Sequence, residues 1–93
     1  MQEEFDVEEE VLVEEITTIE DVRDLIVYND DFNTFDHVIQ TLIKVCKHDV
    51  HQAEQCTYLI HYKGKCSVKK GAYEELKPMR EGITEAGIKA AIV

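Results

Sequence analysis

The sequence predicts an α+β fold in which helices pack on a small, antiparallel-rich three-stranded sheet, in the order strand, helix, helix, strand, helix, strand. Three observations predict it. Apolar residues recur at helical spacing in the longer segments. Short segments alternate between apolar and polar residues, as half-buried strands do. Turn-forming residues separate the two kinds of segment, and 93 residues are enough for one domain.

The first strand is predicted at residues 23–28, where RDLIVY is rich in β-forming residues and is followed by a turn-forming Asn-Asp-Asp. A helix follows over residues 35–46, because its apolar residues recur at intervals of three and four. Asn33 or Thr34 can cap this helix by accepting a hydrogen bond from a backbone N–H of the first turn.

A second helix is predicted from a cap at Asp49 to about Tyr62, and Gly64 fits the left-handed residue that ends many helices. The next strand is predicted over residues 65–70. There, Cys66 and Val68 alternate with polar residues, which is typical of a strand with one buried face.

The third helix is predicted over residues 72–86. Pro78 lies within it, and because proline has no backbone N–H we expect the helix to kink or restart there. Gly87 then breaks the chain. Residues 88–92 alternate again and are predicted to form the last strand.

The charge of −10 is carried by the N-terminal part of the chain. Residues 1–24 contain eleven acidic side chains and one basic one, whereas acids and bases balance over the rest. We therefore expect an acidic extension at residues 1–21 and a globular domain at residues 22–93, because like charges oppose compaction. An acidic chain is a poor partner for nucleic acid. No segment is apolar and long enough for a membrane span or a secretory signal. An odd number of cysteines without a CxxC pair indicates reduced thiols, so a cytoplasmic location is expected.

Few residues indicate chemistry of their own. No nucleophile elbow, phosphate-binding glycine loop or zinc-protease motif occurs, so we expect no enzyme activity and no cofactor. Three cysteines without a CxxC pair are typical of reduced thiols, and Cys46 and Cys56 fall on apolar helical positions. Cys46, His48 and His51 could form part of a metal site. We expect the two histidines instead to be surface residues.

One cluster is more suggestive. Asn29, Asp30 and Asp31 follow the first strand, and His61 lies on the second helix. On their own, the three residues after the strand indicate a solvated turn, and His61 indicates a partly buried histidine. If the helix packs beside the turn, however, amide, carboxylate and imidazole groups converge next to apolar side chains. That arrangement suits a cation attached to an apolar group.

These residues carry a resemblance. The stretch VYNDDFNTF at residues 27–35, followed by HYKGK at residues 61–65, resembles the ClpS family of adaptors of the Clp ATPase–protease. The similarity extends over roughly residues 22–93, and the two motifs are specific as a pair. The resemblance implies a ClpS-like fold and a non-catalytic adaptor that binds N-degrons. These are proteins whose first residue is bulky and hydrophobic: Leu, Phe, Tyr or Trp.

The resemblance also implies residue roles. Asn29, Asp30 and His61 would hold the free α-amino group. The pocket for the first side chain would be formed by Asp31, Phe35, Val38, Thr57, Ile60 and Ile88, with Phe35 as a gate that rejects β-branched residues. The family commonly carries Met at the positions of Phe35 and Thr57, so a preference for Tyr or Trp over Leu is expected here.

The implied partner is the N-terminal domain of a Clp AAA+ chaperone of the ClpA or ClpC kind. Glu74 corresponds to an acidic contact with that domain, and the acidic extension would act as a handle during delivery. Two alternatives stay open. One is a protein-interaction domain of similar fold, such as a ribosomal-stalk-like domain, without degron recognition. The other is a metal-binding regulator using Cys46, His48 and His51.

Overall fold

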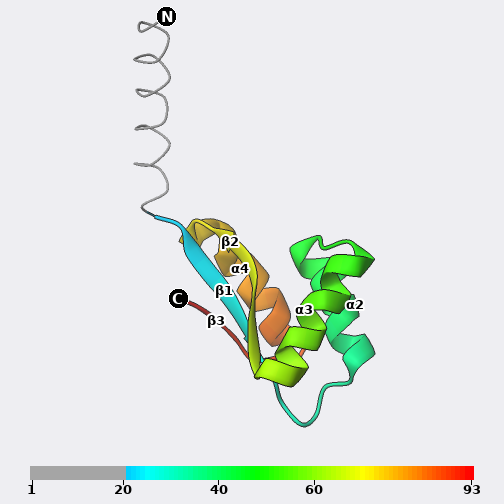
Figure 1. The fold of residues 1–93 in the computed structure, drawn as a ribbon. Coiled ribbons are helices and arrows are strands. Elements are labelled where there is room, and N and C mark those ends of the chain that lie inside the picture. Colours follow the sequence, from blue (N-terminus) through cyan, green and yellow to red (C-terminus); the bar gives the residue numbers. More distant parts are fainter. Residues whose placement is uncertain (1–20) are drawn as a thin grey trace, which may run out of the picture.

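The computed structural model describes residues 21–93. The elements are strand β1 (Arg23–Tyr28), helices α2 (Phe35–Cys46) and α3 (Val50–Lys63), strand β2 (Lys65–Gly71), helix α4 (Tyr73–Glu85) and strand β3 (Ala90–Ile92). The predicted fold class and order of elements are confirmed for this part of the chain (Figure 1). The extension predicted at residues 1–21 lies, up to residue 20, outside the described residues.

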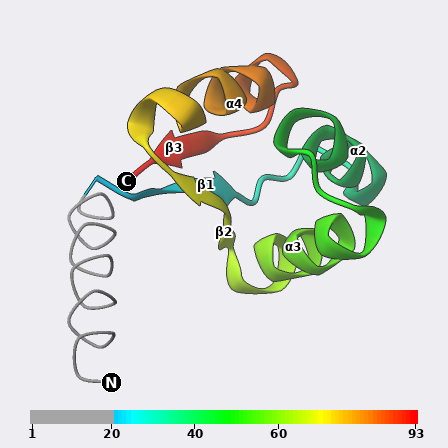
Figure 2. The same cartoon turned by 90° about the horizontal axis from the view of Figure 1, so that it is seen from above.

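Strand β1 is the centre of the sheet. It pairs antiparallel with β2 on one side and with β3 on the other, giving the order β2-β1-β3. Helix α3 packs next to β2, and α4 packs next to β3 (Figure 2). Leu25 and Val27 are fully buried while Asp24 and Ile26 are partly exposed. This alternation is expected when helices cover one face of a sheet.

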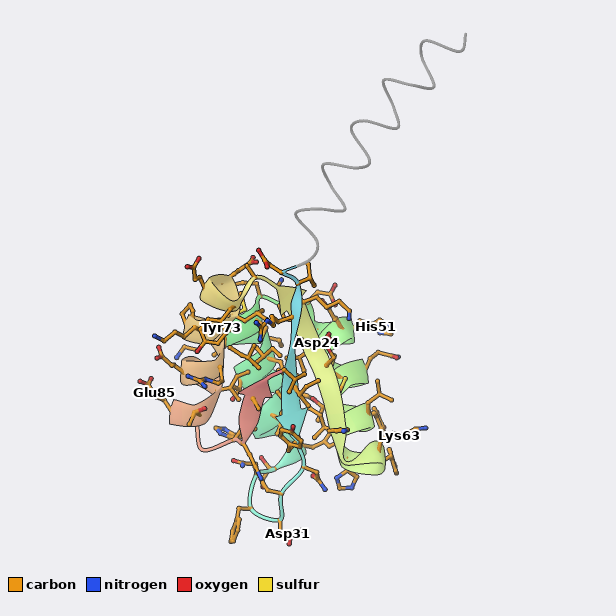
Figure 3. The ribbon with its side chains drawn as sticks, turned by 90° about the vertical axis from the view of Figure 1, so that its left-hand side faces the viewer. Asp24, Asp31, His51, Lys63, Tyr73 and Glu85 are labelled. Carbon is orange, nitrogen blue, oxygen red and sulfur yellow. The ribbon has the colours of Figure 1, made fainter. Side chains whose placement is uncertain are left out.

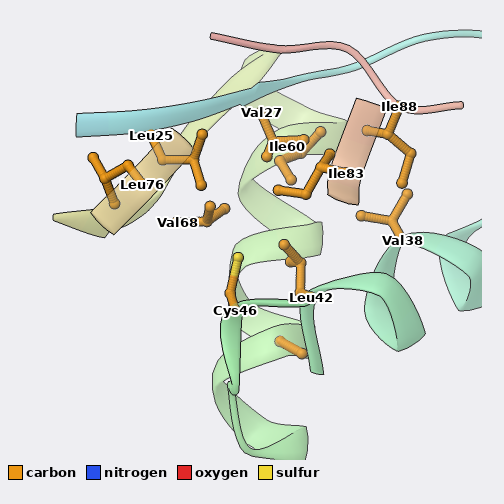
Figure 4. Close-up of a cluster of buried hydrophobic side chains, with 11 residues drawn as sticks. Leu25, Val27, Val38, Leu42, Cys46, Ile60, Val68, Leu76, Ile83 and Ile88 are labelled. Atoms are coloured by element: carbon orange, nitrogen blue, oxygen red, sulfur yellow. The ribbon is translucent and has the colours of Figure 1, made fainter. Parts of the chain in front are cut away.

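The core lies between that face of β1 and the three helices. Figure 4 shows Leu25 and Val27 on β1 above side chains from α2, α3 and α4. The largest fully buried side chains are Leu25, Leu42, Leu76, Ile83, Val27 and Cys46. The apolar stripe predicted from residue spacing on α2 therefore faces the core. Cys46 is fully buried as expected, whereas Cys56 is only half-buried.

The helix ends confirm most of the sequence signals. Thr34, rather than Asn33, caps α2 by accepting from the His37 backbone N–H. Asp49 caps α3 by accepting from the Gln52 N–H, as predicted. Gly64 ends α3 at φ 92°, a conformation that costs a glycine nothing. These signals are local, so the sequence indicates them reliably.

Of the two outcomes expected at Pro78 a restart is excluded, and the start predicted for the last strand is wrong. Helix α4 continues through Pro78 without restarting, since one assigned helix spans Tyr73–Glu85. The last strand begins at Ala90 and not at Ile88. Gly87 adopts φ 86°, and the Ile88 N–H donates to the carbonyl of Ile83 at the end of α4. Ile88 thus lies in the turn between α4 and β3, bonded back to the helix, and its side chain enters the core.

The expectation that His48 lies on the surface is also wrong: only 4% of the residue is exposed. The pairing of β1 with β2 shifts register between Leu25 and Ile26, so Val68 is an extra, bulged residue. His48 Nε2 donates to the Val68 carbonyl over 2.7 Å. A register shift over several strand residues cannot be read from the local sequence, which is why this burial was missed. His51 is exposed, as predicted.

Candidate functional site

The loop after β1 is fixed by its neighbours along the sheet. The Tyr28 N–H donates to the Lys89 carbonyl over 3.0 Å, and the Asn29 N–H donates to the Gly64 carbonyl over 2.9 Å. Gly64 is the residue that ends α3. The second bond therefore holds Asn29 beside the last turn of α3, where His61 lies. This long-range contact is what brings the two motifs of the sequence together.

Asp30 organises the loop. Its Oδ1 accepts from the backbone N–H groups of Phe32 and Asn33 at 2.8 and 2.7 Å. Its Oδ2 accepts from Asn33 Nδ2 at 2.6 Å. Hydrogen bonds from the Asn33 backbone and side chain, and then from the Phe32 backbone, lower the pKa of Asp30. The carboxylate is therefore charged at neutral pH and fixed in position.

Asn33 extends this network to another part of the chain. Its Nδ2 also donates to the Gly87 carbonyl over 2.9 Å, which ties the loop to the turn before β3. The sequence indicated Asn33 only as a helix cap. An Asp followed three residues later by Asn was the available signal, since Asp side chains commonly close such turns onto the backbone.

His61 and Phe35 form an aromatic corner between α3 and the start of α2. Their ring centroids are 5.9 Å apart at 88°, an edge-to-face contact. Phe35 also contacts Tyr58 edge-to-face, with centroids 5.0 Å apart. Phe35, the residue expected to act as a gate, thus contacts two aromatic rings of α3.

An apolar wall faces these groups. It consists of Val38 on α2 and of Thr57 and Ile60 on α3, all buried. Thr57 is polar by composition, but its hydroxyl donates to the Ala53 carbonyl over 2.7 Å. Because this hydroxyl is already bonded within the helix, Thr57 contributes mainly its methyl group to the wall.

Together these residues enclose a pocket of about 320 Å³. It is lined by Asn29, Asp30, Asp31, Asn33, Thr34, Phe35, Val38, Thr57, Ile60 and His61. All but one of the residues that the sequence analysis assigned to the binding pocket thus line one hollow. The exception is Ile88, which is 3% exposed, not in the pocket lining, and at the same end of the core as Val38 in Figure 4.

The proposed partner contact lies elsewhere. Glu74 is exposed in the first turn of α4, directly after Tyr73. In Figure 3, Tyr73 and Asp31 lie at opposite ends of the molecule. A partner bound through Glu74 would therefore leave the pocket accessible.

Other sites considered from the sequence differ from this pocket. Across residues 21–93, no group of three His, Cys, Asp or Glu side chains is arranged to hold a metal ion. Burial raises the pKa of the Cys46 thiol to about 11 and that of the Cys56 thiol to about 12, so both are protonated at neutral pH. Within the same range, no helix has the length and apolar character that a membrane span requires.

Comparison with known proteins shows the family of the chain. Residues 18–90 match the family model described as ATP-dependent Clp protease adaptor protein ClpS. The ATP-dependent Clp protease adapter protein ClpS of Thermosynechococcus vestitus is 37% identical over 68 residues, which are 72% of each chain. A segment of the E3 ubiquitin-protein ligase UBR1 of Drosophila melanogaster is 36% identical over 58 residues, 62% of this chain but 3% of that protein. The chain therefore belongs to the ClpS family of adaptor proteins of the ATP-dependent Clp protease.

Proposed function

We propose that this chain is a non-catalytic adaptor that binds proteins through a bulky hydrophobic N-terminal residue and delivers them to a Clp AAA+ chaperone. The observation that supports it is the pocket's division into two walls. The polar wall is formed by Asn29, Asp30, Asp31 and His61, and the apolar wall by Val38, Thr57 and Ile60. A chain start with a large side chain carries a cation and an apolar group next to each other, as these walls require.

The polar wall would hold the α-amino group. That group has a pKa of about 7.7–8.0, so it is largely protonated at neutral pH. Asp30 supplies a fixed negative charge, although three hydrogen bonds already hold its carboxylate. Asp31 is exposed on the same wall and can add a second carboxylate. We assign the hydrogen bonds to the ammonium to Asn29, Asp30 and His61, with Asp31 beside them.

The energies of these contacts set an upper bound on the affinity. Each hydrogen bond to a charged group contributes about 1.5–3 kcal/mol. Burial of a Leu or Phe side chain contributes about 1.5–3 kcal/mol more. Three such bonds and one buried side chain contribute roughly 6–12 kcal/mol. The roughly −8.2 kcal/mol of micromolar binding is approached only near the top of that range, because association itself costs at least about 4 kcal/mol.

A titration tests the proposal directly. A fluorescent peptide starting with free Phe should bind, whereas the same peptide with an acetylated amine should not. Acetylation removes the charge and leaves the acceptors of the polar wall without a partner. Equal affinity for both peptides, or none for either, contradicts the proposal and favours an interaction domain of this fold without degron recognition.

The apolar wall bears on which first residue is preferred. Thr57 is smaller than the Met common at this position in the family, which leaves a deeper slot. Its hydroxyl is bonded to Ala53, so the slot is not more polar. We therefore propose a preference for Tyr or Trp over Leu, and affinities for peptides starting with Leu, Phe, Tyr and Trp test it. Tightest binding of Leu would contradict it.

Delivery requires the partner. We propose that a ClpA- or ClpC-like N-terminal domain binds the face that carries Glu74 and that residues 1–20 act as a handle during transfer. Deleting residues 1–20 should leave peptide affinity unchanged and should stop degradation by the assembled protease. A parallel loss of peptide affinity would contradict the separate roles. Glu74→Lys should weaken binding to the chaperone domain and leave peptide affinity unchanged.

A further inference from the structure

Aromatic rings continue from the pocket mouth onto the outer surface of α3. Phe35, which lines the pocket, contacts Tyr58 at 5.0 Å between centroids. Tyr58 stacks on Tyr62 at 5.7 Å with the ring planes 6° apart. Tyr62 in turn contacts His61, another pocket residue, at 5.4 Å. We call Phe35, Tyr58 and Tyr62 the aromatic rim.

The rim is exposed although it is apolar. Tyr58 is 52% exposed and Tyr62 is 73% exposed. Tyr58 touches Phe35 and Tyr62 stacks on Tyr58, yet at least half of each tyrosine still faces solvent. The free face of a stacked ring pair is flat, and another planar group can add to it by stacking.

The rim lies where a bound chain would leave the pocket. With its first side chain against the apolar wall and its amine on the polar wall, a peptide has to pass Phe35 or His61, and both touch the rim. Successive Cα atoms are about 3.8 Å apart. The 5.0 Å step from Phe35 to Tyr58 therefore falls within reach of the second residue.

We infer that the aromatic rim is a subsite for the second residue of the bound protein and favours a planar side chain there, an aromatic ring in particular. The inference rests on the proposed function, since it names a second determinant of the same substrate. On this inference the exposed face of α3 binds the substrate chain and not the chaperone. Selection would then depend on two residues of the degron.

The test compares peptides that start Phe-Tyr, Phe-Leu and Phe-Ala. An aromatic contact should make the Phe-Tyr peptide bind about three- to tenfold tighter than the Phe-Ala peptide. The Phe-Leu peptide should fall between them, which separates stacking from simple apolar burial. Acetylated versions of all three report on the proposed function itself.

Variants locate the effect. In Tyr62→Ala, the ratio of the affinities for the Phe-Tyr and Phe-Ala peptides should fall toward one, while the affinity for the Phe-Ala peptide stays the same. Tyr62→Phe should restore the advantage, because it keeps the ring. Tyr73→Ala is the matched control, an exposed tyrosine at the opposite end of the molecule from the pocket. Circular dichroism confirms that each variant is folded.

The outcomes are distinguishable. If free-amine peptides bind, acetylated ones do not, and the second residue makes no difference, the subsite is refuted and the proposed function stands. An advantage that survives Tyr62→Ala also refutes it. If no peptide binds, both proposals fail.

Discussion

Helix α2 separates two hollows that differ in construction. The pocket between α2 and α3 measures about 320 Å³, and the groove between α2 and α4 about 430 Å³. The groove is lined by His37, Gln40, Thr41, Lys44, Val45, Gly82, Glu85 and Ala86. Its size alone would make it the better candidate for a ligand site.

The difference lies in what their polar groups do. In the groove, His37 Nε2 donates to the Ala86 carbonyl and Thr41 donates to the His37 carbonyl. In the pocket, Asp30 is held charged, whereas the side chains of Asn29 and His61 have no hydrogen-bond partner among the described residues. In the groove, the side chains of Gln40, Lys44 and Glu85 likewise have no such partner among the described residues, but Lys44 and Glu85 carry opposite charges. The pocket is lined by two carboxylates and by no Lys or Arg, so it suits a cation. Available chemistry, more than volume, identifies a site.

The largest expected loss of peptide affinity comes from substitutions in the pocket, whereas a substitution in the groove should cause none. His61→Ala and Asp30→Ala should each weaken binding of a Phe-starting peptide by roughly 10- to 150-fold, the equivalent of one charged hydrogen bond. Lys44→Ala, in the groove, should leave affinity unchanged. Fluorescence titration measures all three. Equal losses in the pocket and groove variants would remove the distinction between the hollows.

Asp30→Ala should also affect the loop, because three hydrogen bonds end on its carboxylate. We therefore expect some loss of stability in this variant and little in His61→Ala, since His61 is exposed. Thermal unfolding of both variants separates a loosened loop from a lost contact. His61→Ala is the cleaner test of ligand contact.

The pH dependence should reflect the ligand's amine. Because the folded-state pKa of Asp30 is lowered, its contribution is complete above the unfolded value of about 3.9 and is lost only as pH falls through the lower folded value. Asp30 therefore stays charged at neutral and alkaline pH. Above pH of about 8 the peptide amine deprotonates, and affinity should fall about tenfold per pH unit. Constant affinity up to pH 9.5 would show that binding does not depend on the charge of the peptide amine.

A smaller effect is expected from Asn33→Ala. The substitution removes the hydrogen bonds from Asn33 Nδ2 to Asp30 and to the Gly87 carbonyl. It keeps the backbone N–H of residue 33, which donates a further hydrogen bond to Asp30. Asp30 should then be less firmly oriented, and peptide affinity should fall about three- to tenfold. Gln40→Ala is the groove control and should change nothing. A null result for Asn33→Ala would mean that the backbone bonds alone position Asp30.

The smallest expected change in peptide affinity concerns the Thr57 hydroxyl in the apolar wall, compared with the Thr41 hydroxyl in the groove. Thr57→Val and Thr41→Val each remove a buried hydroxyl that donates to a carbonyl of its own helix. Neither hydroxyl is available to a ligand, so affinity should change by less than about threefold in both variants. A large loss in Thr57→Val alone would show that its hydroxyl leaves Ala53 and bonds the ligand. Peptide titrations of the two variants decide between these outcomes.

The site was predictable to the extent that its residues lie in recognisable motifs. Asn29, Asp30 and Asp31 follow a strand, and His61 lies near the end of a helix, so their residue types indicated a cation site if the two met. Their meeting depends on the hydrogen bond from Asn29 to Gly64. The role of Asn33 as a bridge was missed because its second partner, Gly87, is distant in sequence.

The sequence by itself determined the elements of the described part of the chain, their order, the caps at Asp49 and Gly64, and the apolar stripe of α2. All of these follow from interactions between residues a few positions apart. Only the tertiary structure decided that β3 begins at Ala90, that His48 is buried and bonded to the Val68 carbonyl, and that an aromatic rim adjoins the pocket. Each depends on contacts between segments far apart in the chain, whose geometry no local pattern encodes.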